Sequence, residues 1–438
     1  LRNPDAVMSE HIKWMQETDP RFGLEGALSV FDAQLNANAY FNDNDRLFNN
    51  PFFAGGTNSF RQDKYDYLVE LTKLTGTGSR FTLRNVTDYN WNNAPSNTFP
   101  GAWNSYVETE VRQPLLQGGG IEFNRIAGPA SAPGVYNGIL VARVNTDVSH
   151  TEFEIAVRNY VSNVVNAYWD LYFAYRDLDA RTKAKDRALV TWRIHSSRAD
   201  TGAESKSKEA LAREQYYRFK SEVDEALSGQ LVQGTQTGNG STGGTLRGTS
   251  GVQVAERRLR LLVGIPINDR RLIRPSEEAE FGQMLFDWNA AQSEAFTRRP
   301  ELRRTHLRMK KREMELLASK NFLNPRLDVV GQYRWRGFGD DLLGNGGPHS
   351  ASGANLPTDA LGNLVTGDHQ EWQMGLEFSV PLGMRRAHAA VANAEIGLAR
   401  ERAILREQER QIVHDLSNAI ADVDRAWEAI ENSLNRYL

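Results

Sequence analysis

Alternating apolar and polar positions predict six β-strands in this chain. Between residues 31 and 41 the odd positions carry Phe31, Leu35 and Phe41 with alanines between them, whereas the even positions are polar or tyrosine. A period of two residues is typical of a strand with one apolar face and one wet face. Similar segments occupy residues 65–75, 80–92, 103–115, 326–338 and 371–381. Each is close to the length of about 9–11 residues with which a tilted strand crosses a bilayer.

The connections between these strands and the positions of aromatic residues favour a membrane sheet. Residues 42–64, 93–102 and 339–370 are long and rich in Asn, Asp, Gly and Pro, whereas residues 75–79 form a tight turn. In outer-membrane barrels the long loops face outward and the tight turns face the periplasm. On that assumption the strands at 24–41, 80–92 and 326–338 run outward, and eleven aromatic residues fall at outward ends: Tyr40, Phe41, Tyr65, Tyr67, Tyr89, Trp91, Trp103, Tyr106, Trp335, Phe338 and Trp372. This one-sided girdle favours a membrane barrel over the alternative, a soluble sandwich with aromatic core positions.

A second pattern predicts two long coiled-coil helices. From Val157 to Leu178 the apolar positions are spaced 4, 3, 4, 3, 4 and 3 residues apart, as in a coiled-coil seam. The predicted helix runs from about Gly138 to about Arg198, which makes a rod of about 90 Å. The same seam returns from Ile412 to Ile430, 255 residues after the first.

The chain is therefore predicted to be α+β, an internally duplicated β-strand and long-helix repeat. The strand end Glu110–Leu115 reappears as Glu377–Leu382, with a proline at the same place. The predicted parts are the end of a preceding helix (1–20), strands of the first repeat (21–117), a long helical hairpin (118–228), a flexible Gly/Thr/Ser insert (229–251), the end of the return helix with an equatorial segment and a connecting helix (252–323), strands of the second repeat (324–382) and a second long helix (383–438).

Composition narrows the classes of function. The 438 residues include no cysteine, which excludes a disulfide scaffold, a thiolate metal site and a cysteine nucleophile. The net charge of −3 argues against a nucleic-acid partner held by bulk charge. A mean hydropathy of −0.54, with no apolar run near the necessary length of about 18 residues, excludes a transmembrane helix. A soluble protein and a transmembrane β-barrel remain.

Three motifs in this order resemble the TolC-like outer-membrane efflux protein family across essentially the whole chain. They are EVRQPLLQ at residues 110–117, AYWDL at 167–171 and RRLRLLVGIP at 257–266. The resemblance implies a homotrimer whose protomers jointly form one outer-membrane β-barrel, continued by a periplasmic α-helical coiled-coil barrel. It also implies an exit duct for a tripartite efflux pump or a type I secretion system, which works with a periplasmic adaptor protein and an inner-membrane transporter.

The sequence departs from the family pattern in two ways. The usual pattern is two strands per repeat and twelve in the trimer, but the first repeat here has four predicted strands and the second has two. If all six cross the bilayer, a trimer has eighteen strands; otherwise the hairpin at 65–92 lies outside the membrane. The equivalent of the first hairpin tip at Gly202 would also fall 19 residues beyond the last residue, so the second tip and the final return helix are expected to be missing.

The hairpin tip holds two sets of candidate functional residues. An Arg and a Gly four residues apart at this tip contact the adaptor in the family, so the resemblance implies that role for Arg198 and Gly202. The alternative is a plain helix end with a solvated arginine. Asp200 and Glu204 flank the same turn, and a ring of carboxylates in a trimer would attract cations and act as a periplasmic gate. Because Lys206 and Lys208 follow, a solvated turn of mixed charge is the alternative.

Other candidate positions line the predicted pore or end the predicted strands. Asp32, Gln34, Asn36 and Asn38 occupy the polar side of the first strand and are expected to line water, whereas Phe31, Leu35 and Phe41 are expected to face lipid. Pro114 and Pro381 mark the exits from strand to helix, because proline cannot continue strand pairing.

No catalytic, cofactor or metal site is predicted. The segment from Gly238 to Gly243 matches G-x-G-x-x-G but has no strand before it and no helix after it, so it is not a phosphate site. His349 and His369 share one loop, and no two histidines lie four residues apart on a helix. An enzyme acting on envelope polymers would need a pair of catalytic carboxylates or an activated nucleophile, and none stands out.

The predicted function is a passive conduit in the outer membrane of a Gram-negative-type bacterium, with a periplasmic extension. Its coiled helical ends would open like an iris when the adaptor and the inner-membrane translocase engage them, and these partners would supply the energy. The alternative is a periplasmic coiled-coil adaptor or scaffold protein without a pore. That alternative explains the helical seams but not the aromatic girdle.

Overall fold

The computed structural model describes residues 11–437 apart from 55, 129–131, 233–246, 250, 268, 279–281, 345–356 and 358. The chain divides into two compact units. One comprises Leu1–Phe153 and Asp287–Asp424, and the other comprises Glu154–Phe286 and Arg425–Leu438. The long helices α4 (Ile139–Asp200) and α10 (Arg385–Tyr437) contribute residues to both units.

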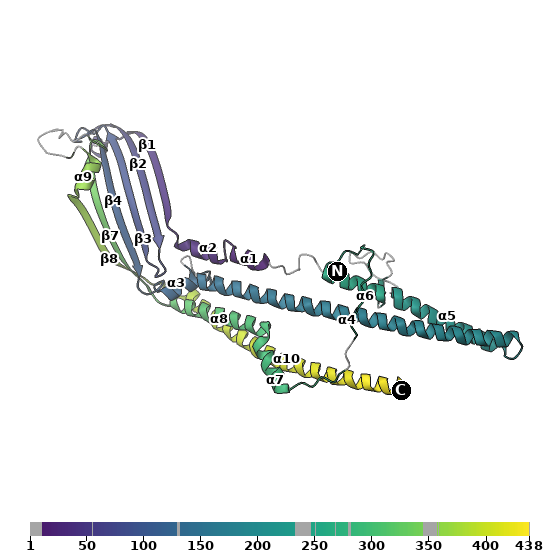
Figure 1. Cartoon of the computed structure of the whole chain (residues 1–438). Coiled ribbons are helices and arrows are strands. Elements are labelled where there is room, and N and C mark those ends of the chain that lie inside the picture. The colour runs from purple at the N-terminus through teal and green to yellow at the C-terminus, as the bar shows by residue number, and fades with distance from the viewer. Residues whose placement is uncertain are drawn as a thin grey trace. The chain divides into compact units, whose positions relative to one another are not determined.

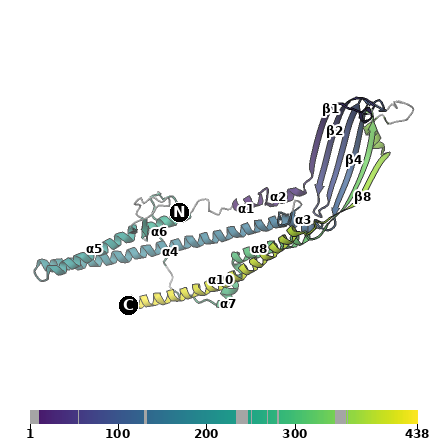
Figure 2. The same ribbon diagram turned by 180° about the vertical axis from the view of Figure 1, so that it is seen from behind.

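Six strands of the first unit form a single antiparallel sheet, with β1 and β8 at its two edges (Figures 1 and 2). Within the described residues β1 pairs only with β2 and β8 only with β7, so the sheet is open. All six predicted strands are confirmed, although β1 and β2 extend further at their outward ends than the alternation predicts. In sheet order the strands are β1 (Gln34–Leu47), β2 (Ser59–Leu74), β3 (Arg80–Asn92), β4 (Gly101–Pro114), β7 (Arg326–Gly339) and β8 (His369–Ser379).

The start of the first strand was predicted wrongly. Residues 24–31, expected to be strand, form helix α2 (Leu24–Leu28) and the 3-10 helix η2 (Ser29–Phe31). Leu24, Ala27 and Leu28 have the spacing of a helical face, and Ala27 is buried. Asp32 follows in a bend, where its amide donates to the Ser29 carbonyl oxygen. Asp32 is therefore not on the strand that was expected to carry it, and β1 begins at Gln34.

The register gives the two faces of the sheet opposite chemistry. Because residues paired across antiparallel strands point to the same side, Leu35, Leu71, Leu83 and Val111 share one face, which we call the apolar face. Eight of the eleven aromatic residues of the predicted girdle lie on this face, and rings from β1 to β4 touch with centroids 5.3, 5.4 and 4.9 Å apart: Phe41, Tyr65, Tyr89 and Trp103. Tyr40, Tyr106 and Phe338 belong to the opposite, polar face because they occupy the alternate positions.

Helices α3 (Ile121–Ala127) and α8 (Pro300–Asn321) pack together at the base of the sheet. The core there contains Phe123 and Ile126 from α3 with Ala318 and Phe322 near the end of α8. The rings of Phe123 and Phe322 meet edge to face with centroids 5.3 Å apart. Further helical segments of this unit are α1 (His11–Glu17), η3 (Pro51–Ala54), α7 (Trp288–Arg298) and α9 (Ala360–Thr366).

The second unit is built around the helical hairpin of α4 and α5 (Lys206–Ser228). Ala167, Leu171 and Ala174 of the predicted seam are buried against Val252 and Leu259 of α6 (Val252–Val263). The predicted long helix is confirmed at 62 residues. Of the predicted insert, β5 (Gln230–Val232) pairs with β6 (Arg247–Thr249), whereas Gly238–Gly243 lies outside the described residues. None of the described helices is long and apolar enough to cross a membrane.

Two glycines allow α9 to lie directly on the sheet. A Cβ at Gly337 would stand 2.0 Å from the carbonyl oxygen of Ala360, and one at Gly339 would stand 2.6 Å from the Ala360 nitrogen. Asn363 of α9 also accepts a hydrogen bond from the Phe338 amide at 3.1 Å. Helix α9 was not predicted, because seven residues give too short a pattern.

Replacing Gly337 with alanine is expected to cost about 1–3 kcal/mol of stability through overpacking and to displace α9. Hydrogen exchange would show this as lost protection of the α9 amides. Gly331→Ala is the matched control, because Gly331 lies on the same strand and face and a Cβ there would meet no atom within 4 Å. Equal protection in the two variants would contradict the close contact.

Candidate functional site

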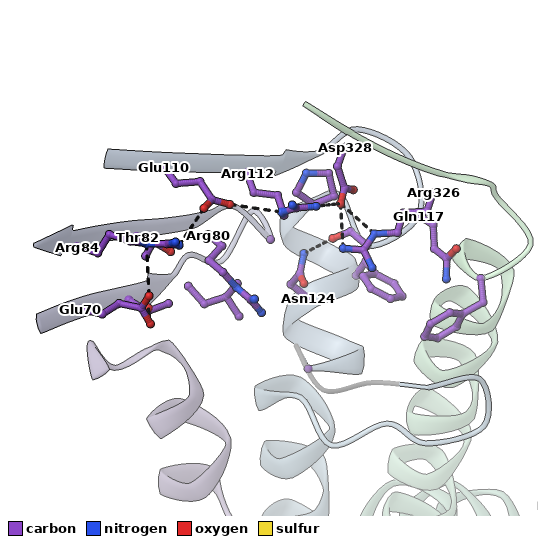
Figure 3. A pocket seen from close by; sticks show the side chains of 18 residues that line it. Glu70, Arg80, Thr82, Arg84, Glu110, Arg112, Gln117, Asn124, Arg326 and Asp328 are labelled. Carbon is purple, nitrogen blue, oxygen red and sulfur yellow. Dashed lines mark hydrogen bonds and ion pairs between the residues drawn. The ribbon is translucent and has the colours of Figure 1, made fainter. Parts of the chain in front are cut away.

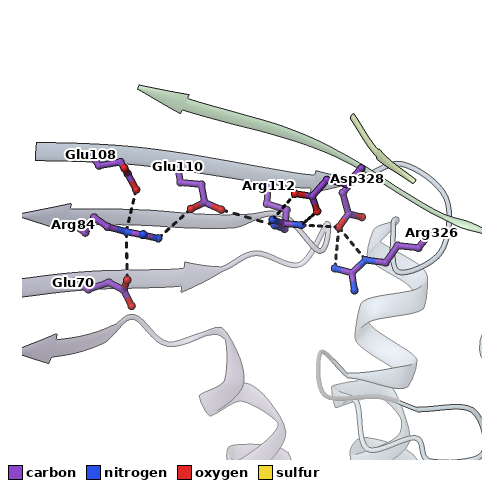
Figure 4. A network of polar contacts seen from close by, with 8 residues as sticks. Glu70, Arg84, Glu108, Glu110, Arg112, Arg326 and Asp328 are labelled. Carbon is purple, nitrogen blue, oxygen red and sulfur yellow. Dashed lines mark hydrogen bonds and ion pairs between the residues drawn. The ribbon is translucent and has the colours of Figure 1, made fainter. Parts of the chain in front are cut away.

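A row of alternating charges crosses the polar face of the sheet, and Figure 4 shows its part from Glu70 through Arg84 to Glu108. Arg84 of β3 lies between two carboxylates, with its Nε 3.5 Å from Glu70 of β2 and 3.2 Å from Glu108 of β4. Arg334 of β7 donates from Nε to the other oxygen of Glu108 at 2.8 Å and from Nη1 to Glu371 of β8 at 3.1 Å. We call these five residues, Glu70, Arg84, Glu108, Arg334 and Glu371, the charge ladder.

The charge ladder is one level of the sheet, because its members are direct partners in the register. At its centre Glu108 is 1% exposed, so this carboxylate depends on its two arginines for compensation. The Arg334 guanidinium also lies over the Tyr106 ring, 4.8 Å from the centroid. A fixed cation over an aromatic face adds to the attraction that holds the row in place.

A branch of the same network leads to the base of the sheet. Arg84 donates to Glu110 at 3.1 Å, and Arg112 donates to Asp328 at 3.3 Å and to Glu377 at 3.2 Å. Arg326 also donates to Asp328, at 2.9 Å. Asp328 is 1% exposed and carries two arginines on one of its oxygens. Charges of both signs therefore continue down the polar face.

A cavity of about 480 Å³ lies where this branch meets the helices (Figure 3). Its sheet wall includes Arg80, Glu110 and Asp328, and its helical wall includes Asn124 of α3 and Phe322 after α8. Asn124 donates to the carbonyl oxygens of Gly118 and Gly120, which fixes the turn between β4 and α3. The cavity is mostly polar, so it suits water and ions better than an apolar ligand.

The hairpin tip is a tight turn between α4 and α5. Gly202 has φ +75°, and the Arg198 carbonyl oxygen accepts from the amides of Ala203 and Glu204 at 2.9 and 3.2 Å. Ser205 caps α5 by accepting from the Ser207 amide. Gly202 therefore takes the left-handed conformation that commonly ends a helix. The Arg198 side chain is exposed, and a Cβ added at Gly202 would meet no atom within 4 Å.

The two carboxylates of the tip differ in their surroundings. Glu204 lies 2.5 Å from Nδ1 of His195 and 3.8 Å from the Arg198 guanidinium. Asp200 is the last residue of α4 and is exposed. The hydrogen bond with His195 lowers the pKa of the Glu204 carboxyl, and the charges of His195, Lys208 and Arg198 act in the same direction. Of the two, Asp200 therefore presents the carboxylate that is open to solvent.

Solved structures that are similar to this chain include outer-membrane and transmembrane channels. The outer-membrane channel OprN superposes on this chain with a TM-score of 0.58 and 10% identity, covering 97% of this chain and 73% of its own. CusC, whose structures concern transmembrane channel formation, gives a TM-score of 0.56 and 12% identity, over 98% of this chain and 75% of its own. This chain has the fold of outer-membrane channels. VceC, an outer membrane protein of Vibrio cholerae, agrees at a TM-score of 0.52 and 10% identity, over 97% and 77% of the two chains. No family model and no curated protein matches the sequence.

The channel fold brings together three of the four predicted pore residues. Gln34, Asn36 and Asn38 lie on β1 on the polar face, and Asn36 is the register partner of Glu70 in the charge ladder. Pro114 is the last residue of β4 and lines the cavity at the base, and Pro381 lies between β8 and α10. The charge ladder itself was not predicted. Its signal in the sequence is the charged residues at alternate positions inside strands, as in Glu108-Thr-Glu110-Val-Arg112.

The described part of the channel fold holds no cluster that would bind a metal. No group of three His, Cys, Asp or Glu side chains converges among the described residues. His369 is the first residue of β8, and His349 lies outside the described residues.

The hairpin tip is expected to loosen in acid. A carboxyl whose pKa is lowered by folding adds stability above its unfolded pKa, and this stability is lost as pH falls through the folded pKa. For Glu204 that window lies below its ordinary value of 4.5. Hydrogen-exchange protection of the Ala203 and Glu204 amides should therefore fall there, and Glu204→Gln should remove most of this pH dependence. Asp200→Asn is the control and should keep it; identical profiles in both variants would contradict the role of Glu204.

Proposed function

We propose that this protein is an exit duct of the outer membrane. Three copies would close one β-barrel from their open sheets, and their long helices would continue it as an α-helical barrel in the periplasm. Solutes would pass passively through the shared lumen. The fold shared with outer-membrane channels supports this proposal.

The observation that carries the proposal is the open sheet with two unlike faces. Leu35 on one edge strand and Trp372 on the other are 67% and 76% exposed, and both belong to the apolar face. In water, an unpaired strand edge tends to pair with another chain, and a wide exposed apolar face tends to associate with other apolar surfaces. In a bilayer every backbone group needs a partner, so a sheet there must close on itself. Closure with further copies would pair β1 with β8 of a neighbouring copy. The apolar face would then contact lipid, and the charge ladder would face the lumen.

The helical hairpin would be the docking end of the duct. Arg198 and Gly202 are the proposed contacts for a periplasmic adaptor, since both are exposed at the tip. The energy would come from an inner-membrane transporter, in either an efflux pump or a type I secretion system. Asp200 and Glu204 remain the proposed gate. Because Glu204 is bound to His195 and Arg198 in this conformation, Asp200 would contribute more of the ring of charge.

Single-channel conductance in a planar bilayer tests the duct. We expect the purified protein to insert as a trimer that conducts ions, and Asp200→Asn combined with Glu204→Gln to change its ion selectivity. Conductance with unchanged ion selectivity in the double variant would support the duct and contradict the assignment of the gate to Asp200 and Glu204. A protein that stays in the soluble fraction and never conducts would reject the duct in favour of a periplasmic adaptor or scaffold.

Neighbouring residues on β1 give an independent test of the two faces. Leu35→Arg would place a charge against lipid, at a cost of about 2–4 kcal/mol near the bilayer centre and less near its surfaces. Asn36→Arg would place the same side chain in the lumen. We expect a lower yield of assembled trimers for Leu35→Arg, and equal yields would contradict the assigned faces.

A further inference from the structure

We infer that the hairpin of β2 and β3 is part of the membrane barrel and widens its lumen, so that each copy contributes six strands. This inference rests on the proposed function. A trimer would then have eighteen strands, which is the size at which barrels leave a water-filled channel. The outer part of the duct would be a wide pore with a charged wall, suited to hydrated, charged solutes.

The first argument is the pairing of the hairpin. The register of β2 with β1 is unbroken from Gln34↔Thr72 to Leu47↔Ser59. The register of β3 with β4 is unbroken from Arg80↔Arg112 to Trp91↔Gly101. β1 and β4 do not pair with each other, because the hairpin lies between them over their full length. A hairpin outside the membrane would leave β1 without its partner strand.

The second argument is that the hairpin carries the same lipid-facing chemistry as the rest of the sheet. Val69 and Leu71 of β2 and Phe81 and Leu83 of β3 are apolar-face residues with exposed side chains. Tyr65 and Tyr89 stack with centroids 5.4 Å apart, and they join Phe41 of β1 to Trp103 of β4 in one aromatic layer. Aromatic residues at one level mark the membrane interface in barrels. The layer would be interrupted without the hairpin.

The third argument is that the polar face of the hairpin completes the charge ladder. Arg84 of β3 is one of the two arginines that face the buried carboxylate of Glu108. Further along, Lys64 pairs with Asp66 at 2.7 Å, and Asp88 accepts from Asn104 of β4 at 2.9 Å. So many charged side chains on one face must be hydrated, because burying charged groups away from water is costly. The hairpin therefore presents a wet wall on one side and an apolar wall on the other, as a barrel segment does.

The topology explains how a barrel can accept this hairpin. The chain runs one way along β2 and the opposite way along β3. β1 and β4 are therefore antiparallel to each other when the hairpin lies between them, and they would also be antiparallel if they paired directly. Because barrel diameter grows roughly linearly with strand number, six strands per copy in place of four would increase the diameter of the barrel about 1.5-fold.

Cysteine labelling in lipid vesicles tests the inference, since the chain has no cysteine of its own. Leu68 and Val69 are neighbours on opposite faces of β2. We expect Leu68→Cys to react with a membrane-impermeant maleimide in vesicles, and Val69→Cys to react only after detergent is added. If both cysteines react in vesicles, the hairpin lies outside the bilayer. If neither reacts, the polar face of the hairpin does not line the lumen. Either result overturns the inference.

A reference pair separates failure of this inference from failure of the duct. Tyr106 and Val107 of β4 lie at the same two levels of the sheet as Leu68 and Val69. Tyr106→Cys should react in vesicles and Val107→Cys should be protected. If the β4 pair shows this contrast and the β2 pair does not, the barrel stands and the hairpin is outside it. If neither pair shows it, the proposed barrel itself fails.

A deletion gives a second measurement that does not depend on labelling. Removing residues 59–92 leaves residues 48–58 and 93–100 to connect β1 to β4. Electron microscopy of the trimers should show a barrel about one third narrower than that of the intact protein. An unchanged barrel width would overturn the inference.

Discussion

Replacing Glu108 with leucine is expected to lower the free energy of unfolding by about 3–5 kcal/mol. The Glu108 carboxylate is 1% exposed and lies between Arg84 and Arg334. Its removal would break both ion pairs at this buried position, leaving Arg84 with Glu70 and Glu110 only and Arg334 with Glu371 only. Breaking a buried ion pair by removing one partner is strongly destabilising. Denaturant unfolding of the detergent-solubilised protein would measure the loss.

Glu371→Gln is the matched control for this prediction. Glu371 also pairs with Arg334, but it stands at the open end of the ladder with its side chain 52% exposed. An exposed ion pair contributes about 0–1 kcal/mol, so the control should be nearly as stable as the wild type. The double variant Glu108→Leu with Arg334→Met should recover part of the loss, because it removes one of the two guanidinium groups that lose Glu108 as a partner. Equal stability of Glu108→Leu and Glu371→Gln would show that the ladder does not stabilise the sheet.

Leu171→Ala is expected to lower the free energy of unfolding of the helical unit by about 2–5 kcal/mol. Leu171 is fully buried on α4, within the cluster that includes Val252 and Leu259 of α6. The loss combines the transfer of the removed carbons with the cavity left between α4 and α6, which cannot close without moving a helix. Thermal unfolding followed by helical circular dichroism would measure it.

The same substitution at an exposed leucine serves as the control. Leu211 of α5 belongs to the same unit and is 71% exposed. Leu211→Ala should change stability by less than about 0.5 kcal/mol, as surface substitutions usually do. If Leu171→Ala were equally mild, the packing of α6 on the α4 seam would be wrong.

The strands and the long helix could be predicted because each has its own local period. Alternation located six strands, and the heptad seam located α4 within a few residues of its ends. The prediction failed at residues 24–31, where Leu24, Ala27 and Leu28 have the spacing of a helical face and not the alternation of a strand. The short helices α3 and α9 were not predicted, because a helix of fewer than eight residues is too short to show a repeated hydrophobic period.

The candidate site divides in the same way. The turn at the hairpin tip is local, and Gly202 was predicted from its neighbours alone. The pairing of Glu204 with His195 was missed, although nine residues separate them, because it requires the geometry of the turn. The charge ladder joins residues 226 positions apart, Glu108 and Arg334. Sequence shows that each is a charged residue within a strand, but only the register shows that they meet.

The charge ladder also determines which alignment of the strands is allowed during assembly. A slip of one residue would turn a whole strand over and put Arg84 or Arg334 on the apolar face, so the apolar pattern alone opposes it. A slip of two residues keeps every side chain on its proper face, and the apolar pattern cannot detect it. Such a slip would set Arg84 opposite Leu68 or Thr72 in place of Glu70. The charge ladder therefore disfavours register slips of two residues, which the hydrophobic pattern alone does not disfavour.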